Sequence, residues 1–379
     1  MPGRSAATSK HFPPPGVPLP SGGRHPLLDL FLFLVFLYLF LFSIELMSAA
    51  FKLAGKGFAE HLLTMTSDPV AGLIIGIVVT SIIQSSSTTT SIVVGLVAAG
   101  SLDLRLAIPV IMGANIGTTV TNTIVSLGHV RNPKEMERAF AAATVHDFFN
   151  IMSVLVLFPM ELRFHLIEKT ATALERAFEG AGGVAMVSPL KLILGPPVHH
   201  LKDLLPHPVP LLVLAFLVLF LSLSRMVRLM RRHVMGRAEG FFSRGLFRND
   251  AIAYLVGWIL TSLVQSSSVT TSLVVPLAGT GALSVREIYP YTLGANLGTT
   301  ITALLASLAT ANPAAVTVAL SHLVFNMFGT AVFYPLRILP IRLSTGLGAI
   351  AARSRRNLVY VFVIYALLHV IPIVYVLFR

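Results

Sequence analysis

The sequence contains no cysteine and few charged residues. Without cysteine, the chain has no disulfide, no thiolate nucleophile and no zinc–thiolate site. Charged residues make up only 12% of the 379 residues, whereas 55% are apolar and the mean hydropathy is +0.81. A soluble globular protein needs more polar surface than this composition provides. The composition therefore indicates an integral membrane protein.

Three other features are missing from the sequence. It has no Walker-type phosphate loop, no His, Asp or Glu cluster at metal-ligand spacing, and no aromatic residues interleaved with its basic ones. These absences argue against direct use of ATP, a metal centre and nucleic-acid binding. The net charge of +12 is then a topology signal, because Lys and Arg gather in cytoplasmic links between membrane helices.

Long apolar segments predict seven membrane-spanning helices. Residues 1–26 are rich in Pro, Gly and Ser, cannot bury a core, and are predicted to be a disordered tail. A signal peptide is the alternative interpretation of the next segment, but residues 27–47 are long enough to span a bilayer. The predicted spans are 27–47, 105–127, 139–160, 209–224, 286–309, 315–336 and 357–378.

Two further segments, 69–99 and 250–280, are apolar at their ends but polar in the middle. Each contains a run of hydroxyl and amide side chains that begins Gln-Ser-Ser-Ser, at Gln84 in the first and at Gln265 in the second. Polar, irregular backbone at membrane depth survives only where protein or a watery cavity lines it. Both segments are therefore predicted to be re-entrant helical hairpins.

Basic residues set the predicted orientation. The arginine-rich links 225–248 and 337–356 are expected in the cytoplasm, in contrast to the uncharged link 310–315. If both hairpins return to the side from which they enter, residues 1–26, 128–138, 225–249 and 337–356 lie inside. Residues 161–208 then lie outside.

An internal repeat is the strongest observation in the sequence. Residues 80–127 align with 261–308 at a constant offset of 181 without a gap, and 25 of the 48 positions are identical. After a five-residue shortening, the pentapeptide that starts at His146 aligns with the one that starts at His322. Chance similarity between apolar helices does not produce such a match. The chain is therefore predicted to contain two copies of one unit.

The predicted orientation makes the two copies inverted, because the first starts with an outward helix at Leu27 and the second with an inward helix at Leu211. Many secondary transporters are built in this way and bind substrate near the midplane between the repeats. The predicted fold class is an all-α integral membrane, inverted-repeat transporter with about seven spanning helices and two re-entrant helical hairpins. Its predicted parts are the tail (1–26), membrane repeat 1 (27–160), an outer linker (161–208), inverted membrane repeat 2 (209–340), and a basic loop with a C-terminal membrane helix (341–379).

The matched polar runs predict an ion site. Their oxygens suit a hard cation such as Na⁺, while their hydroxyl and amide hydrogens suit an oxyanion, helped by helix N-termini that Gly113 and Gly294 are expected to open. A tetrahedral phosphate fits a hydroxyl-rich cradle better than a flat carboxylate does. The plain alternative is that Ser and Thr only cement helix packing.

Asp147 is the single residue that most strongly indicates ion binding, because it lies inside the apolar span 139–160. An ionised carboxylate there costs at least about 2.5 kcal/mol, which a bound cation would offset. The alternative places Asp147 near a hydrated helix end. His146 and His322 are expected to be neutral and bonded to backbone carbonyls, with a proton relay as the alternative. Arg105 and Arg286, at matching helix starts, are expected to be interfacial anchors, with attraction of an anion as the alternative.

At these residues the chain resembles the type II sodium-dependent phosphate cotransporter family. The two Gln-Ser-Ser-Ser motifs at Gln84 and Gln265 are that family's signature, and the stretch 138–150 is similar to its animal members. The resemblance runs from about residue 30 to 369. It implies inverted repeats, a midplane site shared by the two hairpins, and cotransport of divalent phosphate with Na⁺. An acidic residue at the position of Asp147 marks electrogenic members, so electrogenic uptake is expected.

The chain departs from animal members in its outer link of about 48 residues and in the absence of cysteine and of any Asn-x-Ser/Thr sequon. A compact prokaryotic-type member is therefore predicted, multi-pass in the cell membrane, with phosphate and Na⁺ as ligands and no resident cofactor. The expected phosphate contacts are Ser85, Ser86, Ser266, Ser267, Asn115, Asn296, Thr118 and Thr299. The expected Na⁺ contacts are Gln84, Gln265, Ser87, Ser268, Asp147, Asn150, Thr119 and Thr300.

Other functions remain open from the sequence. Within transport, sulfate or a dicarboxylate could replace phosphate. An intramembrane serine hydrolase would need one activated Ser with one base, and the duplication of the entire run argues against it. A passive channel is a third possibility, because Gly-Ala-Asn-x-Gly-Thr-Thr (113–119 and 294–300) could line a filter.

Overall fold

The computed structural model describes residues 26–65, 68–118, 120–180, 183–241, 246–364 and 367. Within these ranges the chain is helical and contains no strand. The predicted tail, apart from Pro26, lies outside the described residues. So do the predicted Na⁺ ligand Thr119 and most of the predicted span 357–378.

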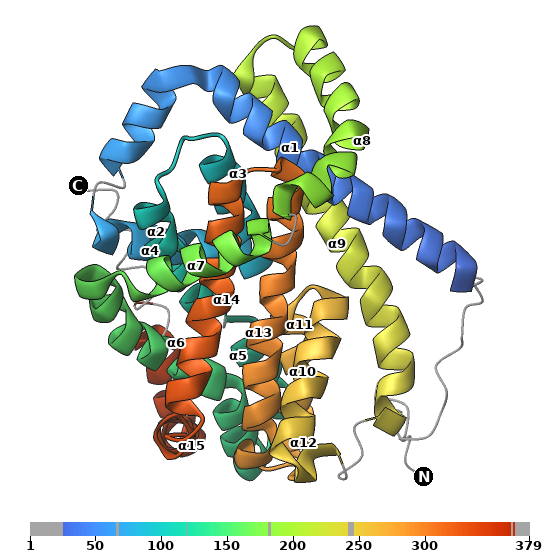
Figure 1. Ribbon diagram of the computed structural model, residues 1–379. Helices are drawn as coiled ribbons and strands as arrows, with labels where there is room; N and C mark the ends of the chain where they lie inside the picture. Colours follow the sequence, from blue (N-terminus) through green and yellow to red (C-terminus); the bar gives the residue numbers. More distant parts are fainter. Residues whose placement is uncertain are drawn as a thin grey trace, which may run out of the picture.

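Residues 355–364 are helical, and a series of helical elements precedes them along the described chain (Figure 1). Their bounds are α1 (Pro26–Met65), α2 (Pro69–Ile83), α3 (Ser86–Ala98), α4 (Leu104–Gly117), α5 (Val120–Ser126), η1 (Leu127–His129), α6 (Pro133–Phe164), α7 (Leu166–Gly180), α8 (Gly183–Leu204), α9 (Pro208–Phe241), η2 (Leu246–Arg248), α10 (Asp250–Val264), α11 (Ser267–Ser272), α12 (Val274–Gly279), α13 (Val285–Thr310), α14 (Pro313–Phe333) and α15 (Ile338–Ala352).

Six helical segments among the described residues are long and apolar enough to cross a membrane. They confirm six of the seven predicted spans, and the chain is accordingly an all-α, multi-pass membrane protein. The six segments are Leu27–Ala54, Leu104–His129, Pro133–Phe164, Pro208–Met230, Val285–Thr310 and Pro313–Phe333.

Both segments with polar runs fold as helix–turn–helix hairpins. In the first, α2 and α3 meet at a turn at Gln84, and the hydroxyl of Thr80 lies 2.9 Å from that of Thr89. In the second, α10 and α11 meet at Gln265, and the equivalent hydroxyls of Thr261 and Thr270 lie 2.6 Å apart. The helices flanking each turn are shorter than the roughly 20 residues that span a bilayer.

Each hairpin is held by one neighbouring helix through very close backbone contact. A Cβ atom on Gly76 of α2 would overlap the carbonyl oxygen of Val110 in α4, and one on Gly257 of α10 would overlap that of Tyr291 in α13. Small residues allow membrane helices to approach in this way. Both contacts occur at positions that differ by the repeat offset of 181, so the duplicated sequence builds duplicated packing.

The remaining helices surround this framework. α1 packs along α9, and α15 packs against α6 (Figure 1). Residues 341–352 were expected to belong to a basic loop, but they are helical and lie in α15, where Gly348 approaches the backbone of Glu137 in α6. The predicted linker 161–208 likewise contains two helices, α7 and α8.

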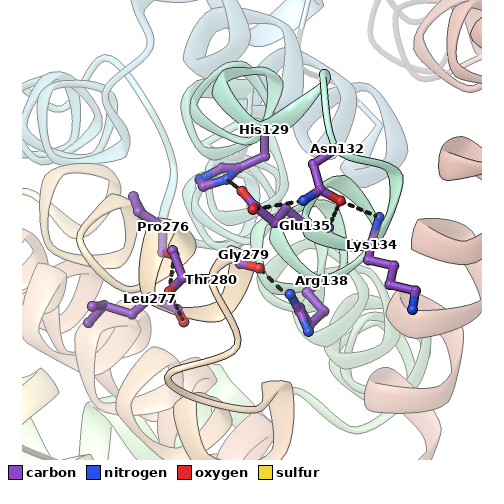
Figure 2. Close-up of polar contacts among 9 residues, drawn as sticks. All are labelled: His129, Asn132, Lys134, Glu135, Arg138, Pro276, Leu277, Gly279 and Thr280. Carbon is purple, nitrogen blue, oxygen red and sulfur yellow. Dashed lines mark hydrogen bonds and ion pairs between the residues drawn. The ribbon is translucent and has the colours of Figure 1, made fainter. Parts of the chain in front are cut away.

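Polar contacts tie the start of α6 to the end of α12 (Figure 2). The Arg138 side chain donates from Nε to the carbonyl oxygen of Gly279 at 3.0 Å. Nearby, the Glu135 carboxylate accepts one hydrogen bond from the Asn132 amide and lies 2.9 Å from the His129 ring nitrogen Nδ1. The bond from Arg138 connects the end of the second hairpin to a helix of the first copy, and the other two contacts order the start of that helix.

Candidate functional site

The two hairpin turns share one backbone conformation. Gln84 and Gln265 occupy the left-handed region with φ of 58° and 60°, and the serine after each is extended and caps the next helix. A non-glycine residue in this region costs about 1–2 kcal/mol, and such strain gathers at functional sites. The backbone therefore singles out the same two residues as the sequence repeat.

The two turns come together in the interior. The Ser87 hydroxyl of the first hairpin donates to the backbone carbonyl of Gln265 in the second at 3.2 Å. Thr302 of α13 donates to the side-chain oxygen Oε1 of Gln265 at 2.6 Å, and its hydroxyl lies 3.4 Å from that of Ser87. Four oxygens from three parts of the chain thus converge, which is the kind of environment that hard cations prefer.

The first hairpin has a related arrangement. Thr121, which matches Thr302 at the repeat offset, donates to the Oε1 atom of Gln84 at 3.3 Å. Its neighbour Asn122 donates from Nδ2 to the Thr271 hydroxyl at 2.8 Å, which links α5 to α11. The Oδ1 atom of buried Asn122 has no hydrogen-bond partner among the described residues. This oxygen is available to a ligand.

The predicted serines all lie at the turns. Ser85 and Ser266 are half-buried and accept the capping hydrogen bonds of α3 and of α11, from the backbone nitrogens of Thr88 and Val269. The three serines Ser86, Ser267 and Ser268 are buried within the first turns of the same helices. Hydroxyls and free backbone N–H groups therefore occupy one region, as anion binding at helix N-termini requires.

The predicted asparagines instead form a second buried cluster with the two histidines. The His146 atom Nε2 lies 3.1 Å from Asn296 Oδ1, and the His322 atom Nε2 lies 3.3 Å from Asn115 Oδ1. Asn296 donates to the Asn150 and Asn326 side chains at 2.8 and 2.7 Å. The prediction that the histidines bond to backbone carbonyls is therefore wrong, because each histidine contacts a side-chain amide oxygen of the other copy instead.

Asn150 and Asp147 lie on the same helix, α6, but have different surroundings. Asn150 donates to the backbone carbonyl of Asn115 at 2.9 Å and accepts from Asn296, so it belongs to the asparagine–histidine cluster. Asp147 is 4% exposed and lies midway along α6. Its burial contradicts the alternative in which it is hydrated near a helix end.

Three predicted threonines bond to their own helices. The hydroxyls of Thr118 and Thr299 donate to the carbonyls four residues earlier, and the Thr300 hydroxyl donates to that of Leu297 at 2.7 Å. Both Gly113 and Gly294 lie inside continuous helices, so the expectation that they open helix N-termini is wrong. They allow close packing instead, since a Cβ on either would overlap a carbonyl oxygen of its hairpin.

The structure also corrects the statement that no metal-ligand cluster exists. Ligand atoms of Glu161, His165 and Glu168 lie within 4.8 Å of one another at the junction of α6 and α7. The Glu161 carboxylate accepts hydrogen bonds from the backbone nitrogens of Ile167 and Glu168 at 2.6 and 3.2 Å. These residues therefore have a structural role in capping α7.

Sequence reasoning missed Thr121, Thr302 and Asn122. The first two could have been found, since both lie in the aligned repeat at the offset of 181. Asn122 is matched by Ala303, so the repeat gives no signal for it. Its contact with Thr271 depends on how α5 and α11 pack.

Comparison with known proteins agrees with this geometry. The family model for the Na⁺/Pi-cotransporter matches residues 39–186 and 218–350, which together make up well over half of the chain. The chain belongs to the Na⁺/Pi-cotransporter family. Each of the two matched ranges contains one hairpin and its Gln-Ser-Ser-Ser turn.

Mammalian members of the Na⁺/Pi-cotransporter family resemble the chain along most of its length. It is 34% identical over 437 residues to sodium-dependent phosphate transport protein 2B of Homo sapiens, a match that covers 89% of this chain and 63% of that protein. It is 35% identical over 410 residues to protein 2A of Mus musculus, with 87% and 64% covered. The chain thus spans less than two thirds of the length of these relatives. No solved structure matches it.

Proposed function

We propose that the chain is a secondary active transporter that takes up inorganic phosphate with Na⁺ by alternating access. The observation that carries the proposal is the contact between the two duplicated hairpin turns, in which Ser87 donates to the carbonyl of Gln265. Two matched turns that meet inside a membrane protein create one polar region in which an ion pair can lose its water. The names of the mammalian relatives supply the substrate and the coupling ion.

The oxygens around the turns are assigned to Na⁺. Besides the originally predicted Gln84, Gln265, Ser87 and Ser268, the geometry supports Thr302 and the free Oδ1 atom of Asn122 as ligands. Sodium is a hard cation, and neutral oxygens satisfy it without a large electrostatic cost.

Phosphate is assigned to the turn serines Ser85, Ser86, Ser266 and Ser267. Their hydroxyls and the first backbone N–H groups of α3 and α11 supply hydrogen-bond donors and the positive ends of helix dipoles. The buried asparagines are assigned to the contact between the two copies, because they already bond to one another and to the histidines. They are Asn115, Asn150 and Asn296.

Transport requires the two copies to move relative to each other. We assign the moving parts to the two inverted repeats, and the hairpin turns lie between them. The arginine-rich segments 225–249 and 337–356 are assigned to the cytoplasmic side of the cell membrane. Figure 1 shows α12 and α15 at one end of the molecule and α8 at the other, which agrees with this orientation.

Uptake is proposed to be electrogenic because of Asp147. A buried carboxylate in the middle of α6 favours a cation beside it, so an additional Na⁺ would enter with each phosphate. Net positive charge would then move inward during each cycle.

The test is uptake of labelled phosphate into proteoliposomes with and without an inward Na⁺ gradient. We expect concentrative, saturable uptake only with Na⁺, and no inhibition by an excess of sulfate or of a dicarboxylate. Uptake at the same rate with and without the Na⁺ gradient would exclude coupling to Na⁺. Full competition by sulfate or a dicarboxylate would show that phosphate is not the specific substrate. Uptake that never exceeds equilibrium would indicate a channel.

A further inference from the structure

A polar cleft and an apolar groove adjoin each other at the foot of the second hairpin. The cleft has a volume of about 580 Å³ and is lined by Phe247, Asn249, Asp250, Arg286, Glu287 and Arg337. The groove has a volume of about 410 Å³ and is lined by Asp250, Ala251, Tyr254, Leu255, Thr330 and Tyr334, between α10 and α14. Because Asp250 lines both, the two form a continuous surface with one charged end and one apolar end.

One of the two cations in the cleft, Arg286, forms no ion pair within the described residues and interacts with Asp250 only through the longer-range attraction between their charges. Arg337 forms an ion pair with Asp250, which also accepts a hydrogen bond from the Tyr334 hydroxyl at 2.9 Å. Glu287 caps α13 by accepting hydrogen bonds from the backbone nitrogen and the hydroxyl of Ser284, both at 2.7 Å. Exposed Arg286 has no hydrogen bond or ion pair within the part of the chain that is described.

The repeat shows that this free charge is specific to the second copy. Arg105, which matches Arg286 at the offset of 181, lies 3.5 Å from the Glu168 carboxylate in an ion pair. The two arginines occupy the same position, the second residue, in α4 and in α13. Only Arg286 is therefore left to attract an outside anion.

The groove beside the cleft adjoins an exposed apolar surface. Four large apolar side chains are exposed along the outer surface of α10, at the helical spacing that forms one continuous stripe: Ile252, Leu255, Ile259 and Leu263. At the end of the groove the Arg337 guanidinium lies 5.2 Å from the centre of the Tyr334 ring. Tyrosine and arginine are typical of the level of the lipid headgroups.

We propose that this surface binds an anionic phospholipid, with its phosphate at Arg286 and an acyl chain in the groove between α10 and α14. An amphiphile is required because the polar and apolar parts are continuous. A net anionic headgroup is favoured because Asp250 is paired with Arg337 and Glu287 is hydrogen-bonded to Ser284, while five arginines and no acidic residue occur from Arg337 to Arg356. Basic pockets between membrane helices bind anionic headgroups in this way.

The single tryptophan of the chain offers a direct assay. Trp258 lies one turn beyond Tyr254 on α10, the helix that forms one wall of the groove. Brominated acyl chains quench tryptophan on contact, so the full-length protein is reconstituted in phosphatidylcholine with increasing fractions of brominated phosphatidylglycerol or brominated phosphatidylcholine. We expect brominated phosphatidylglycerol to bind about fivefold more strongly, the effect of one arginine at a membrane surface.

Two variants and one matched control locate the effect. Arg286→Gln should abolish the preference by removing the headgroup contact, and Ala251→Phe should weaken it by filling the groove without adding a tryptophan. Arg105→Gln should retain the full preference. An unchanged elution profile and tryptophan emission in phosphatidylcholine alone identify the variants that are folded.

Three results would overturn the proposal. Equal quenching by the two brominated lipids in the unmodified protein excludes an anionic-lipid site, and a preference that survives both Arg286→Gln and Ala251→Phe places such a site elsewhere. The third is loss of the preference when inorganic phosphate replaces chloride at constant ionic strength, which would assign the cleft to free phosphate.

Discussion

His146 and Asn296 join the two copies of the repeat, with His146 Nε2 3.1 Å from Asn296 Oδ1. The reciprocal pair, His322 and Asn115, joins them in the opposite sense at 3.3 Å. Asn296 donates through Nδ2 to two other amide oxygens, and the Nδ2 atom of Asn150 lies 3.1 Å from the same His146 nitrogen, so the histidine contacts an amide of each copy. This exchange of partners is what a two-fold relation between the copies would produce.

Removing Asn296 should destabilise the protein more than removing its counterpart. Asn296→Ala removes three side-chain hydrogen bonds, to His146, Asn150 and Asn326, whereas Asn115→Ala removes only the side-chain bonds to His322 and to its own helix. An unpaired buried polar group costs about 1–3 kcal/mol. Thermal unfolding in detergent should show the larger loss for Asn296→Ala, and equal losses would contradict the asymmetry.

The close contact between hairpin and supporting helix should not tolerate a methyl group. Gly76→Ala and Gly257→Ala each place a Cβ on a backbone carbonyl, which cannot move without shifting α4 or α13. Overpacking of this kind costs about 1–3 kcal/mol or more. The matched control is Gly128→Ala, where a Cβ meets open space. Folded yield and melting temperature should fall for the first two variants only.

Acid should weaken the foot of the second hairpin through Asp250. The Arg337 guanidinium, bonded to this carboxyl, holds the pKa of Asp250 below its usual value, against the opposing effect of burial. A lowered folded pKa means that the ion pair stabilises the protein above the unfolded pKa of about 3.9 and loses this effect as the pH falls through the folded pKa.

The size of that effect is limited because both side chains are partly exposed. Asp250→Asn should cost at most about 1 kcal/mol at pH 7, and this cost should shrink as the pH falls from about 3.9 towards 2. Arg337→Gln should show the same pH dependence. Melting temperatures measured across this range check it, and a constant difference from the unmodified protein would exclude the ion pair as its cause.

Asp147→Gly should separate charge movement from uptake. Removal of the buried carboxylate takes away the proposed additional Na⁺, so the phosphate-evoked current should vanish while part of the Na⁺-dependent phosphate uptake remains. Current and labelled uptake measured on the same proteoliposomes test this. An undiminished current would refute the role of Asp147, and Asp250→Asn is a matched control outside the proposed site.

Much of the fold could be predicted from the sequence because its causes are local. A run of apolar residues predicts a span, and the Gln-Ser-Ser-Ser turns at Gln84 and Gln265 predict the hairpin breaks, since their side chains compete with helical hydrogen bonds. The arginines of the link 337–356 led to the wrong prediction of a loop over residues 341–352, because apolar packing of α15 on α6 decides the conformation there.

The partners of the polar side chains could not be predicted. An amide suits a cation, a phosphate or another amide equally well, so Asn115, Asn150 and Asn296 looked like ligands until the packing of α4, α6 and α13 placed them beside one another. The role of a glycine is equally hard to predict, because glycine is found both where two helices pack closely and where a helix begins. Gly113 and Gly294 serve packing.

The central claim is that both hairpin turns contribute to a single phosphate site. It is tested most directly by the concentration dependence of Na⁺-driven phosphate uptake in Ser86→Ala and in Ser267→Ala, one variant from each turn. Loss of one hydrogen bond to a charged ligand costs about 1.5–3 kcal/mol, so each variant should raise the half-saturating phosphate concentration about tenfold or more. If either serine can be replaced without such a change, the two turns do not share one site.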